Sequence, residues 1–477
     1  MHSSQRSMRG TSRARADRPT TLLLLVVCCL TFSLCHASPE EGWQQVREIL
    51  SRIQPPRIPD HDFRVTDYGA VGDGRTDCTQ AFRRAIDTAA AEGGGRVVVP
   101  EGTFLSGPIH LKSNINLHLA KGARIAFSTN PEDYLPPVYS RWEGIECMMY
   151  SPLIYAYGQE NIALTGRGVL DGQSSDENWW RFSRLQKEDR ARLGRYGDEG
   201  VPVEQRVFGR GSKLRPLMIQ FYRCRNVLIE GLTIKDSPFW HIHPVLSQNV
   251  TIKDVTVTGM GPNNDGCDPE SSRDVLISGC TFNTGDDCIA IKSGRNNDGR
   301  RVGIPSEDIV VRDCVMKNGH GGVVMGSEMT GGIRSVFIED CTMDSPHLDR
   351  AIRIKTNAVR GGFVENVFVR RITIGQVAEA VLKVNFRYEE GDHGPYTPVV
   401  RNIQMEGITG RQCGRVLYLD GYDRSPIRGV ALRNCTFQSV AQPDFIRGVK
   451  NLVLENVRAN GKALEAAPAD ASPAPMR

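Results

Sequence analysis

Residues 249–282 read NVTIKDVTVTGMGPNNDGCDPESSRDVLISGCTF. The segments at its two ends, 249–257 and 274–282, each open on Asn or Asp and then alternate apolar with other residues. This period of two is typical of a β-strand with one buried face, because successive side chains point to opposite sides. The stretch therefore predicts two similar strands joined by a polar connection.

The same pattern recurs along most of the chain. Similar segments begin at residues 226, 249, 274, 308, 335, 366, 402, 429 and 451, at steps of 22 to 36 residues. They are short and β-branched with no amphipathic helix between them, which favours the coils of a parallel β-helix over a helical repeat. An antiparallel sandwich is the alternative, but it leaves the regular Asn/Asp-Val-x-Ile opening unexplained. We predict an all-β fold, a single-stranded parallel β-helix of about ten coils.

The N-terminal end of such a solenoid needs a cap, because its last coil exposes unpaired core. After a lead-in at 38–60, with a helix from Trp43 to Ile53, the sequence predicts strand, glycine turn, helix and strand. Asp77 is the expected N-cap of the second helix, and glycines at 93–95 are expected to end it. We expect this helix to cap a β-helix domain spanning residues 61–460.

Three segments depart from the repeat. Residues 173–213 are charged and aromatic, and we interpret them as an insertion over one end of a groove. Residues 461–477 are Ala- and Pro-rich and predict a disordered tail. Residues 1–37 join five Arg to an apolar run that is short for a membrane span, as in a cleaved secretory signal peptide. We expect a soluble protein in the periplasm, the cell wall or the medium.

The net charge restricts the classes of partner that the protein is expected to bind. Without residues 1–37 the formal net charge is zero, so global attraction to nucleic acid or to a membrane surface has no support. An anionic ligand must then meet a local basic patch.

Ten cysteines remain, and Cys280, Cys314, Cys341 and Cys435 take one position in similar strands. We expect a buried stack of small apolar residues rather than disulfides or a zinc site.

Four polar clusters recur at intervals of 21, 33 and 33 residues, measured from Asp265 to Asp286, Asp287 to His320 and His320 to Arg353. Equivalent positions of successive coils stack along a solenoid, about 4.8 Å apart, so we expect one surface patch. The clusters are Asn263-Asn264-Asp265, Gly285-Asp286-Asp287, Gly319-His320-Gly321 and Arg353-Ile354-Lys355.

The patch predicts acid and base chemistry on an anionic substrate. Carboxylates this close repel one another, which raises at least one pKa and leaves a protonated acid beside an ionised base, as glycoside hydrolysis requires. His320 could tune the protonation of the acid. Arg353 and Lys355 alternate on one strand, share a face and could grip an anion. Each of these clusters taken alone also suits an ordinary solvated turn or face.

In this order the clusters resemble glycoside hydrolase family 28, the polygalacturonases and related pectin hydrolases, over roughly residues 60–455. The resemblance implies a right-handed β-helix, no metal or other cofactor, and inverting hydrolysis of α-1,4-galacturonosidic bonds. It implies that Asp286 is the general acid, that Asp265 and Asp287 activate water, and that His320 lies near the acid. Substrate-binding roles are implied for Asn263, Arg353, Lys355 and Tyr388.

Two clusters depart from the well-known fungal pattern of this family. Asn-Asn-Asp replaces Asn-Thr-Asp, and Gly-Asp-Asp replaces Gln-Asp-Asp, but both changes keep the carboxylates. The resemblance also implies galacturonate rather than a rhamnose-containing backbone, because hydrolases of the latter tend to lack the residues that His320, Arg353 and Lys355 match. Further basic residues also fit a polyanion: Lys292, Arg295, Arg300, Arg301 and Arg350.

The mode of attack and two rival functions stay open at this point. The insertion and residues 237–245 (SPFWHIHPV) resemble members that close one end of the groove, which favours exo over endo action. Rhamnogalacturonan or xylogalacturonan are alternative substrates. One rival is a calcium-dependent pectate lyase, with Asp265, Asp268, Asp286 and Asp287 as oxygen ligands. The other is a β-helix that binds acidic polysaccharide without cleaving it. We expect a monomer acting on pectin or its oligomers.

Overall fold

The computed structural model describes residues 39–465 of the chain. The predicted signal peptide, residues 1–37, lies outside the described residues, as does the tail from 466 onward. Order extends a few residues past 460, because the short strand β36 (Lys462–Ala463) pairs antiparallel with the preceding strand. The predicted disordered tail, 461–477, therefore begins with residues that take part in the sheet.

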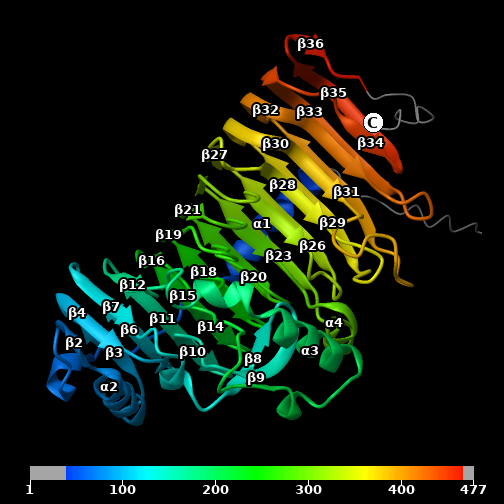
Figure 1. The fold of residues 1–477 in the computed structure, drawn as a ribbon. Coiled ribbons are helices and arrows are strands. Elements are labelled where there is room, and N and C mark those ends of the chain that lie inside the picture. The colour runs from blue at the N-terminus through cyan, green and yellow to red at the C-terminus, as the bar shows by residue number, and fades with distance from the viewer. Residues whose placement is uncertain (1–38, 466–477) are drawn as a thin grey trace, which may run out of the picture. The chain divides into compact units, whose positions relative to one another are not determined.

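Most strands form three parallel stacks, in which each strand pairs with its equivalents one coil away (Figure 1). The first stack contains β1 (Asp62–Arg64), β3 (Gly95–Val99), β6 (Ile115–Leu119), β11 (Glu160–Gly166), β15 (Arg225–Glu230), β18 (Gln248–Lys253), β20 (Arg273–Ser278), β23 (Ser306–Arg312), β26 (Ile333–Glu339), β29 (Phe363–Arg370), β31 (Val399–Glu406), β33 (Ile427–Val440) and β35 (Val449–Ala459).

The second stack contains β2 (Asp73–Asp77), β4 (Gly102–Ser106), β7 (Ala123–Phe127), β12 (Val169–Asp171), β16 (Thr233–Lys235), β19 (Thr256–Gly259), β21 (Thr281–Thr284), β24 (Val315–Met316), β27 (Thr342–Asp344), β30 (Thr373–Asn385) and β32 (Thr409–Asp420). The third contains β5 (Ile109–His110), β10 (Ile154–Tyr157), β14 (Ile219–Tyr222), β17 (Ile242–Val245), β22 (Ile289–Ile291), β25 (Val323–Gly326), β28 (Arg350–Lys355) and β34 (Phe445–Arg447). The long strands β30 and β32 turn the corner from the second stack into the third.

The alternating pattern explains this architecture. In β15 the side chains of Val227 and Ile229 are buried while those of the intervening residues are only partly covered. In β18, Val250 and Ile252 are buried in the same register. Stacking these inward side chains coil upon coil builds one continuous apolar core. The predicted fold, an all-β right-handed parallel β-helix, is confirmed.

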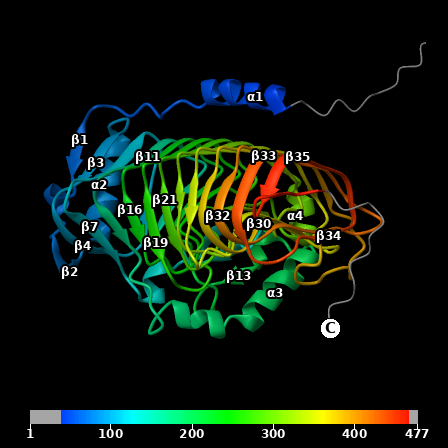
Figure 2. The same ribbon diagram turned by 90° about the horizontal axis from the view of Figure 1, so that it is seen from above.

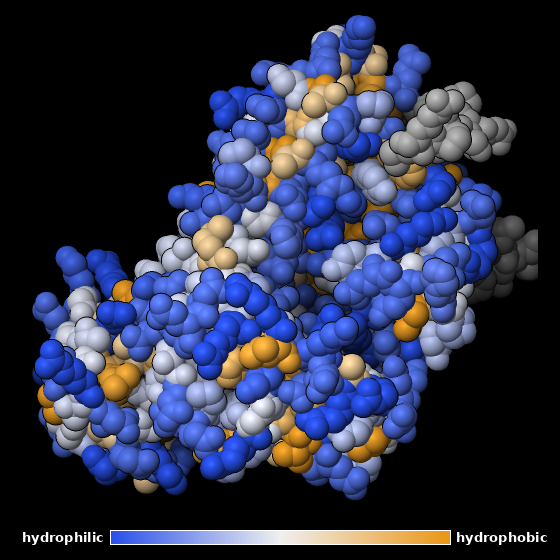
Figure 3. Space-filling model, in the orientation of Figure 1, coloured by the Kyte–Doolittle hydropathy of each residue, from blue (hydrophilic) through white to orange (hydrophobic). Residues whose placement is uncertain are grey.

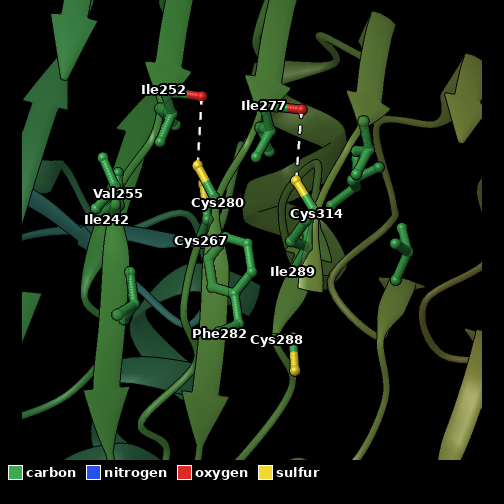
Figure 4. Packing of buried hydrophobic residues seen from close by; sticks show 14 of the residues in the cluster. Ile242, Ile252, Val255, Cys267, Ile277, Cys280, Phe282, Cys288, Ile289 and Cys314 are labelled. Atoms are coloured by element: carbon green, nitrogen blue, oxygen red, sulfur yellow. Dashed lines mark hydrogen bonds between the residues drawn. The ribbon is translucent and has the colours of Figure 1, made fainter. Parts of the chain in front are cut away.

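The cysteine stack is also confirmed. Cys280, Cys314, Cys341 and Cys435 are free and buried, as are the other cysteines of the described residues. Figure 4 shows Cys280 and Cys314 on neighbouring coils, with Cys280 Sγ 3.5 Å from Ile252 O and Cys314 Sγ 3.8 Å from Ile277 O. Each thiol thus packs in the apolar core and donates a weak hydrogen bond to a backbone carbonyl of the preceding coil.

Two helices of the N-terminal region lie against the stacks. Helix α2 (Thr79–Ala91) covers the first coil with its buried face, as predicted for the cap (Figure 1). The predicted N-cap was wrong by one residue: Cys78 holds that position, because Asp77 is still the last residue of β2. Helix α1 (Pro39–Arg52) packs Val46 and Ile49 on the outer face of the first stack, against Val310, Phe337 and Phe368.

The insertion forms a small layer of its own. It contains η3 (Trp180–Arg184), α3 (Lys187–Asp198), η4 (Val203–Gln205) and β13 (Val207–Phe208). Strand β13 joins a hairpin that the sequence did not predict, formed by β8 (Val138–Trp142) and β9 (Ile145–Met149). Figure 2 shows α1 and α3 on opposite sides of the strand stacks. The remaining short helices are η1 (Val65–Tyr68), η2 (Pro131–Tyr134) and α4 (Asn296–Val302).

One face of the described chain is predominantly polar. Figure 3 shows this face, on which blue hydrophilic residues dominate and orange residues are scattered. The large exposed apolar side chains, such as Val71, Leu185, Met260 and Ile304, come from separate parts of the sequence. Within residues 39–465 the structure contains no helix that is both long and apolar enough to traverse a lipid bilayer.

Candidate active site

Three carboxylates meet where the chain enters the third stack. Asp265 precedes Cys267 by two residues and Asp287 precedes Ile289 by two, and Cys267 forms a parallel β-bridge with Ile289. The two aspartates therefore hold equivalent positions on neighbouring coils. One carboxylate oxygen from each of Asp265, Asp286 and Asp287 lies within 4.8 Å of the others.

Glycines shape the bend that carries two of these carboxylates. Asp286 and Asp287 lie between β21 and β22, outside either strand, so they escape the strict alternation of a strand. A Cβ on Gly285 would come within 2.6 Å of Gly261 O, and one on Gly319 within 2.5 Å of Asp286 O. Side chains at either position would push the neighbouring coils apart, so the bend requires glycine.

Two cations from β28 face the carboxylates. Lys355 Nζ donates a hydrogen bond of 2.7 Å to Asp287 Oδ2, and Arg353 Nη1 lies 3.6 Å from Asp287 Oδ1. Burial lowers the pKa of Lys355, but the groups around it, Asp287 foremost, together outweigh this and raise the pKa, so the ammonium stays charged. The ring of Tyr388 lies 5.5 Å from Arg353 Cζ and 5.4 Å from Lys355 Nζ, within the range of a cation–π contact.

His320 pairs with Asp286 from the next coil. Its Nδ1 lies 3.0 Å from Asp286 Oδ1, and its side chain is half exposed. The hydrogen bond to Asp286 raises the pKa of His320. Burial raises the pKa of Asp286, but the hydrogen bond from His320 and the charge of Lys355 outweigh it and bring that pKa down to about 2. The pair therefore carries its shared proton on the imidazole.

Asp265 has the opposite environment. Burial and the nearby charge of Asp286 raise its pKa to about 8, although Lys292 opposes the effect. Lys292 Nζ lies 3.5 Å from Asp265 Oδ2, 3.5 Å from Asp268 Oδ1 and 3.4 Å from Glu328 Oε2. It also lies 4.3 Å above the ring of Trp240. A buried ammonium thus joins three acidic residues at the base of the site.

These groups line a polar cavity of about 430 Å³. Asn263 lies at its edge, where its Oδ1 accepts a 2.6 Å hydrogen bond from Arg215 Nη2. Every predicted site residue except Asp287 lines the cavity, and Asp287 lies behind it, paired with Lys355. The lining residues are Glu143, Arg190, Trp240, Asn263, Asp265, Asp286, Lys292, His320, Ser327, Glu328, Asp349, Arg350, Arg353, Lys355, Tyr388 and Glu389.

A network of ion pairs bounds the cavity on one side. Arg190 Nε on α3 donates to Glu143 Oε2 at 2.6 Å, and Arg295 Nη1 donates to the same oxygen at 2.9 Å. Arg190 Nη2 also lies 3.7 Å from Glu389 Oε1, on the loop after β30. We call Glu143, Arg190, Arg295 and Glu389 the wall. Beyond Glu143 and Arg190 lies a second cavity of about 530 Å³, so this pair separates two hollows.

The sequence missed some of these residues and misplaced others. Glu143 and Arg190 belong to segments outside the repeat, and no spacing signal pointed to them. Lys292 and Arg350 line the cavity as predicted for a polyanion site, and Arg295 adjoins it in the wall. Arg300 and Arg301 do not line it: they lie on α4, where Arg301 pairs with Asp298 and Arg300 stacks on Tyr396.

Among the described residues, the carboxylates of Asp265, Asp286 and Asp287 form one group whose oxygen atoms lie close enough together to bind the same cation. Oxygen atoms suit calcium. Lys355 and Lys292 already supply positive charge here, each within 3.5 Å of one of these carboxylates. The two ammonium groups therefore offset part of the negative charge of the carboxylates, and the site sets carboxylic acids beside a cationic anchor.

Comparisons with known proteins agree with this chemistry. The family model for Glycosyl hydrolases family 28 matches residues 204–456, more than half of the chain, and a model for Rhamnogalacturonase A/epimerase, pectate lyase-like, matches residues 63–120. A Vitis vinifera relative named probable polygalacturonase is 30% identical over 80% of this chain and 75% of its own length. The exo-poly-alpha-D-galacturonosidase of Dickeya chrysanthemi is 27% identical over 73% of this chain and 62% of its own.

Solved structures give the same result. A hyperthermoactive exopolygalacturonase from Thermotoga maritima matches with a TM-score of 0.85 and 44% identity, over 89% of this chain and 97% of that one. A polygalacturonase from Erwinia carotovora, 22% identical with a TM-score of 0.64 over 84% of this chain and 98% of its own, shares the fold. This protein belongs to glycosyl hydrolases family 28 and is a glycoside hydrolase.

Proposed function

We propose that the protein hydrolyses the α-1,4-galacturonosidic bonds of polygalacturonate and acts from chain ends. One observation carries this proposal: Asp265, Asp286 and the cations Arg353 and Lys355 line a cavity that the wall bounds on one side. A groove open at both ends suits cleavage within a polymer, whereas a bounded pocket suits a chain end. Similarity to exopolygalacturonases from Thermotoga maritima and Dickeya chrysanthemi supports the same mode.

The anionic substrate is supported by the charge of the cavity. Arg353 and Lys355 are 8% and 7% exposed, so their charges are screened little by solvent. A uronate carboxylate fits a guanidinium with two parallel hydrogen bonds and an ammonium with one. The ring of Tyr388, stacked beside both cations, offers an apolar face for a sugar. Arg353 and Lys355 share the single carboxylate of Asp287, so a bound uronate would supply the second negative charge, which an uncharged sugar would not.

Asp286 is the proposed acid. Burial alone raises its pKa, and the charge of Lys355 is one of the effects that oppose this. A substrate carboxylate bound at Lys355 would cancel part of that opposing charge. We therefore expect binding to move the proton from His320 to Asp286, which then delivers it to the leaving glycosidic oxygen. Asp265 and Asp287 are the proposed acceptors of the proton from the attacking water.

The stereochemistry of hydrolysis tests this assignment. The resemblance implies inversion, in which one water held by Asp265 and Asp287 attacks directly. Their oxygen atoms and that of Asp286 lie within 4.8 Å, closer than the roughly 6.5–9.5 Å between the carboxyls of most inverting glycosidases. On spacing alone, a retaining mechanism is the alternative. Proton NMR of the first product decides: inversion of the α-linkage gives β-galacturonate first, and retention gives the α-anomer.

The substrate is tested with the protein acting on polygalacturonate in the presence of a chelator. Reducing ends and the ultraviolet absorbance of unsaturated uronates are followed together. We expect reducing ends to rise without absorbance and without any effect of the chelator. An absorbance rise that the chelator abolishes would indicate calcium-dependent elimination instead. Activity on rhamnogalacturonan or xylogalacturonan, with none on polygalacturonate, would overturn the proposed substrate.

Export and assembly complete the proposal. The basic and apolar character of residues 1–37 supports secretion of the enzyme to the periplasm, the cell wall or the medium, where pectin is found. We propose that the enzyme acts as a monomer. We propose no nucleic-acid or membrane partner and no metal cofactor.

A further inference from the structure

Asp268 is a buried acid near the base of the cavity. It has no role in the reaction proposed above. Its side chain is 0% exposed, and among the described residues neither of its carboxylate oxygens has a hydrogen-bond partner. An ionised carboxylate in such a place costs several kcal/mol unless it is paired and hydrogen-bonded. The neutral, protonated acid avoids this cost.

The surroundings of Asp268 contain one cation and several acids. Lys292 Nζ lies 3.5 Å from Asp268 Oδ1, but the same ammonium is shared with Asp265 and Glu328. The other charged groups that act on Asp268 are Asp265, three residues earlier on the same connection, and Asp287 on the next coil. One ammonium shared among three acids does not neutralise them all.

Asp265 and Asp268 therefore share one proton, and the structure favours its location on Asp268. Asp265 lines the cavity and faces Lys292, whereas Asp268 does not reach the cavity. Burial and the charge of Asp265 raise the pKa of Asp268 well above its usual range. A proton on Asp268 would make its buried carboxyl a hydrogen-bond donor, and the carboxylate of Asp265, which shares Lys292 with it, offers an acceptor.

We propose that Asp268 is a positioning residue that stays protonated and donates its hydrogen bond to Asp265, which keeps Asp265 ionised as the proton acceptor for the attacking water. The raised pKa of Asp265 in the ligand-free site then belongs to the pair rather than to Asp265 alone. In the reaction an O–H bond of the attacking water breaks and its proton passes to Asp265. Asp268 keeps its own proton. This inference rests on the proposed role of Asp265.

Two substitutions separate this role from simple packing. D268N keeps the volume and supplies an amide N–H in place of the acid O–H, so we expect kcat to stay within about tenfold of wild type. D268V keeps the bulk but supplies no donor. We expect D268V to lower kcat by about a hundredfold with little change in KM, and to shift the acidic limb of the pH profile upward. If D268N lost as much activity as D268V, the proposal would be wrong.

The location of the proton is measured directly by infrared difference spectroscopy near pH 6.5, below the pair's last titration. D268N should remove the carbonyl band of one protonated carboxyl. D298N is the matched control, because Asp298 is equally buried but ion-paired with Arg206 at 2.7 Å, and it should leave that band in place. Loss of the band in D265N but not in D268N would place the proton on Asp265 and overturn the inference.

The experiment also keeps this inference distinct from the proposed function. Absence of galacturonate release by the wild-type enzyme would contradict the proposed function, whatever the variants do. Release by the wild type, with D268N and D268V equally impaired at equal thermal stability, would contradict the role of Asp268 alone. Thermal unfolding of each variant shows whether a loss of activity comes from a loss of stability. If it does, the infrared measurement decides whether Asp268 carries the proton.

Discussion

His320 Nδ1 lies 3.0 Å from Asp286 Oδ1, and the two residues come from neighbouring coils 34 positions apart in the chain. Their contact couples the histidine to the proposed acid. Because the pKa of His320 is raised and that of Asp286 is lowered to about 2, the charged pair exists between these two values. It is lost as pH rises through the pKa of His320 or falls through that of Asp286.

The first prediction concerns H320A. In the wild type the pair keeps its proton up to the raised pKa of His320, and we expect activity to fall as pH rises through it. Without the imidazole, the proton depends on Asp286 alone. The basic limb of the kcat profile should therefore move to lower pH, with kcat lower by about a hundredfold. An unchanged basic limb in H320A would show that another group sets it.

The second prediction concerns the anchor Lys355. Asp287 is 0% exposed, so K355M would leave a buried carboxylate without its closest cation. We expect the free energy of unfolding, measured with urea, to fall by about 3–5 kcal/mol. The double variant K355M/D287N should recover most of this stability but no activity. As a control, R96M breaks the exposed pair with Asp62 and should change stability by about 1 kcal/mol or less.

The third prediction concerns the wall. E143A/R190A removes the pair that separates the two cavities. We expect the products from tetragalacturonate to change from monomer alone to a mixture containing dimer. R184A is the control on the same insertion, because Arg184 pairs with Asp176 at the exposed surface away from the cavity. A monomer-only pattern in the double variant would show that other groups limit product length.

The fourth prediction concerns the thiols. Burial raises the pKa of Cys224 and Cys288 to about 12, and every cysteine of the described residues is buried and free. We expect a thiol reagent to label the ten cysteines at Cys78 and beyond only after unfolding. Rapid labelling of the folded protein at neutral pH would contradict the stack of apolar thiols.

The repeat made the fold predictable. The alternation in segments such as 249–257 and 274–282 marks buried and exposed faces, and their spacing marks the coils. Because parallel coils stack in register, the interval of 21 residues from Asp265 to Asp286 also predicted the proximity of these carboxylates in space. The spacing of the polar clusters thus predicted that the carboxylates and the cations of β28 lie together.

The wall and the buried acid could not be predicted in the same way. Glu143 and Arg190 are 47 residues apart on a hairpin and a helix that interrupt the repeat, so no period relates them. Asp268 carries no sequence signal that distinguishes a neutral acid from a calcium ligand. Its state follows from complete burial and from the sharing of Lys292, which are properties of the packed coils.

The most direct test of the central claim is product length during the first turnovers on hexagalacturonate labelled at its reducing end. A bounded cavity at a chain end predicts galacturonate monomer and a labelled pentamer from the earliest time points, followed by successively shorter labelled chains. Early appearance of labelled dimer, trimer and tetramer together would show cleavage at internal bonds and contradict the account of the wall.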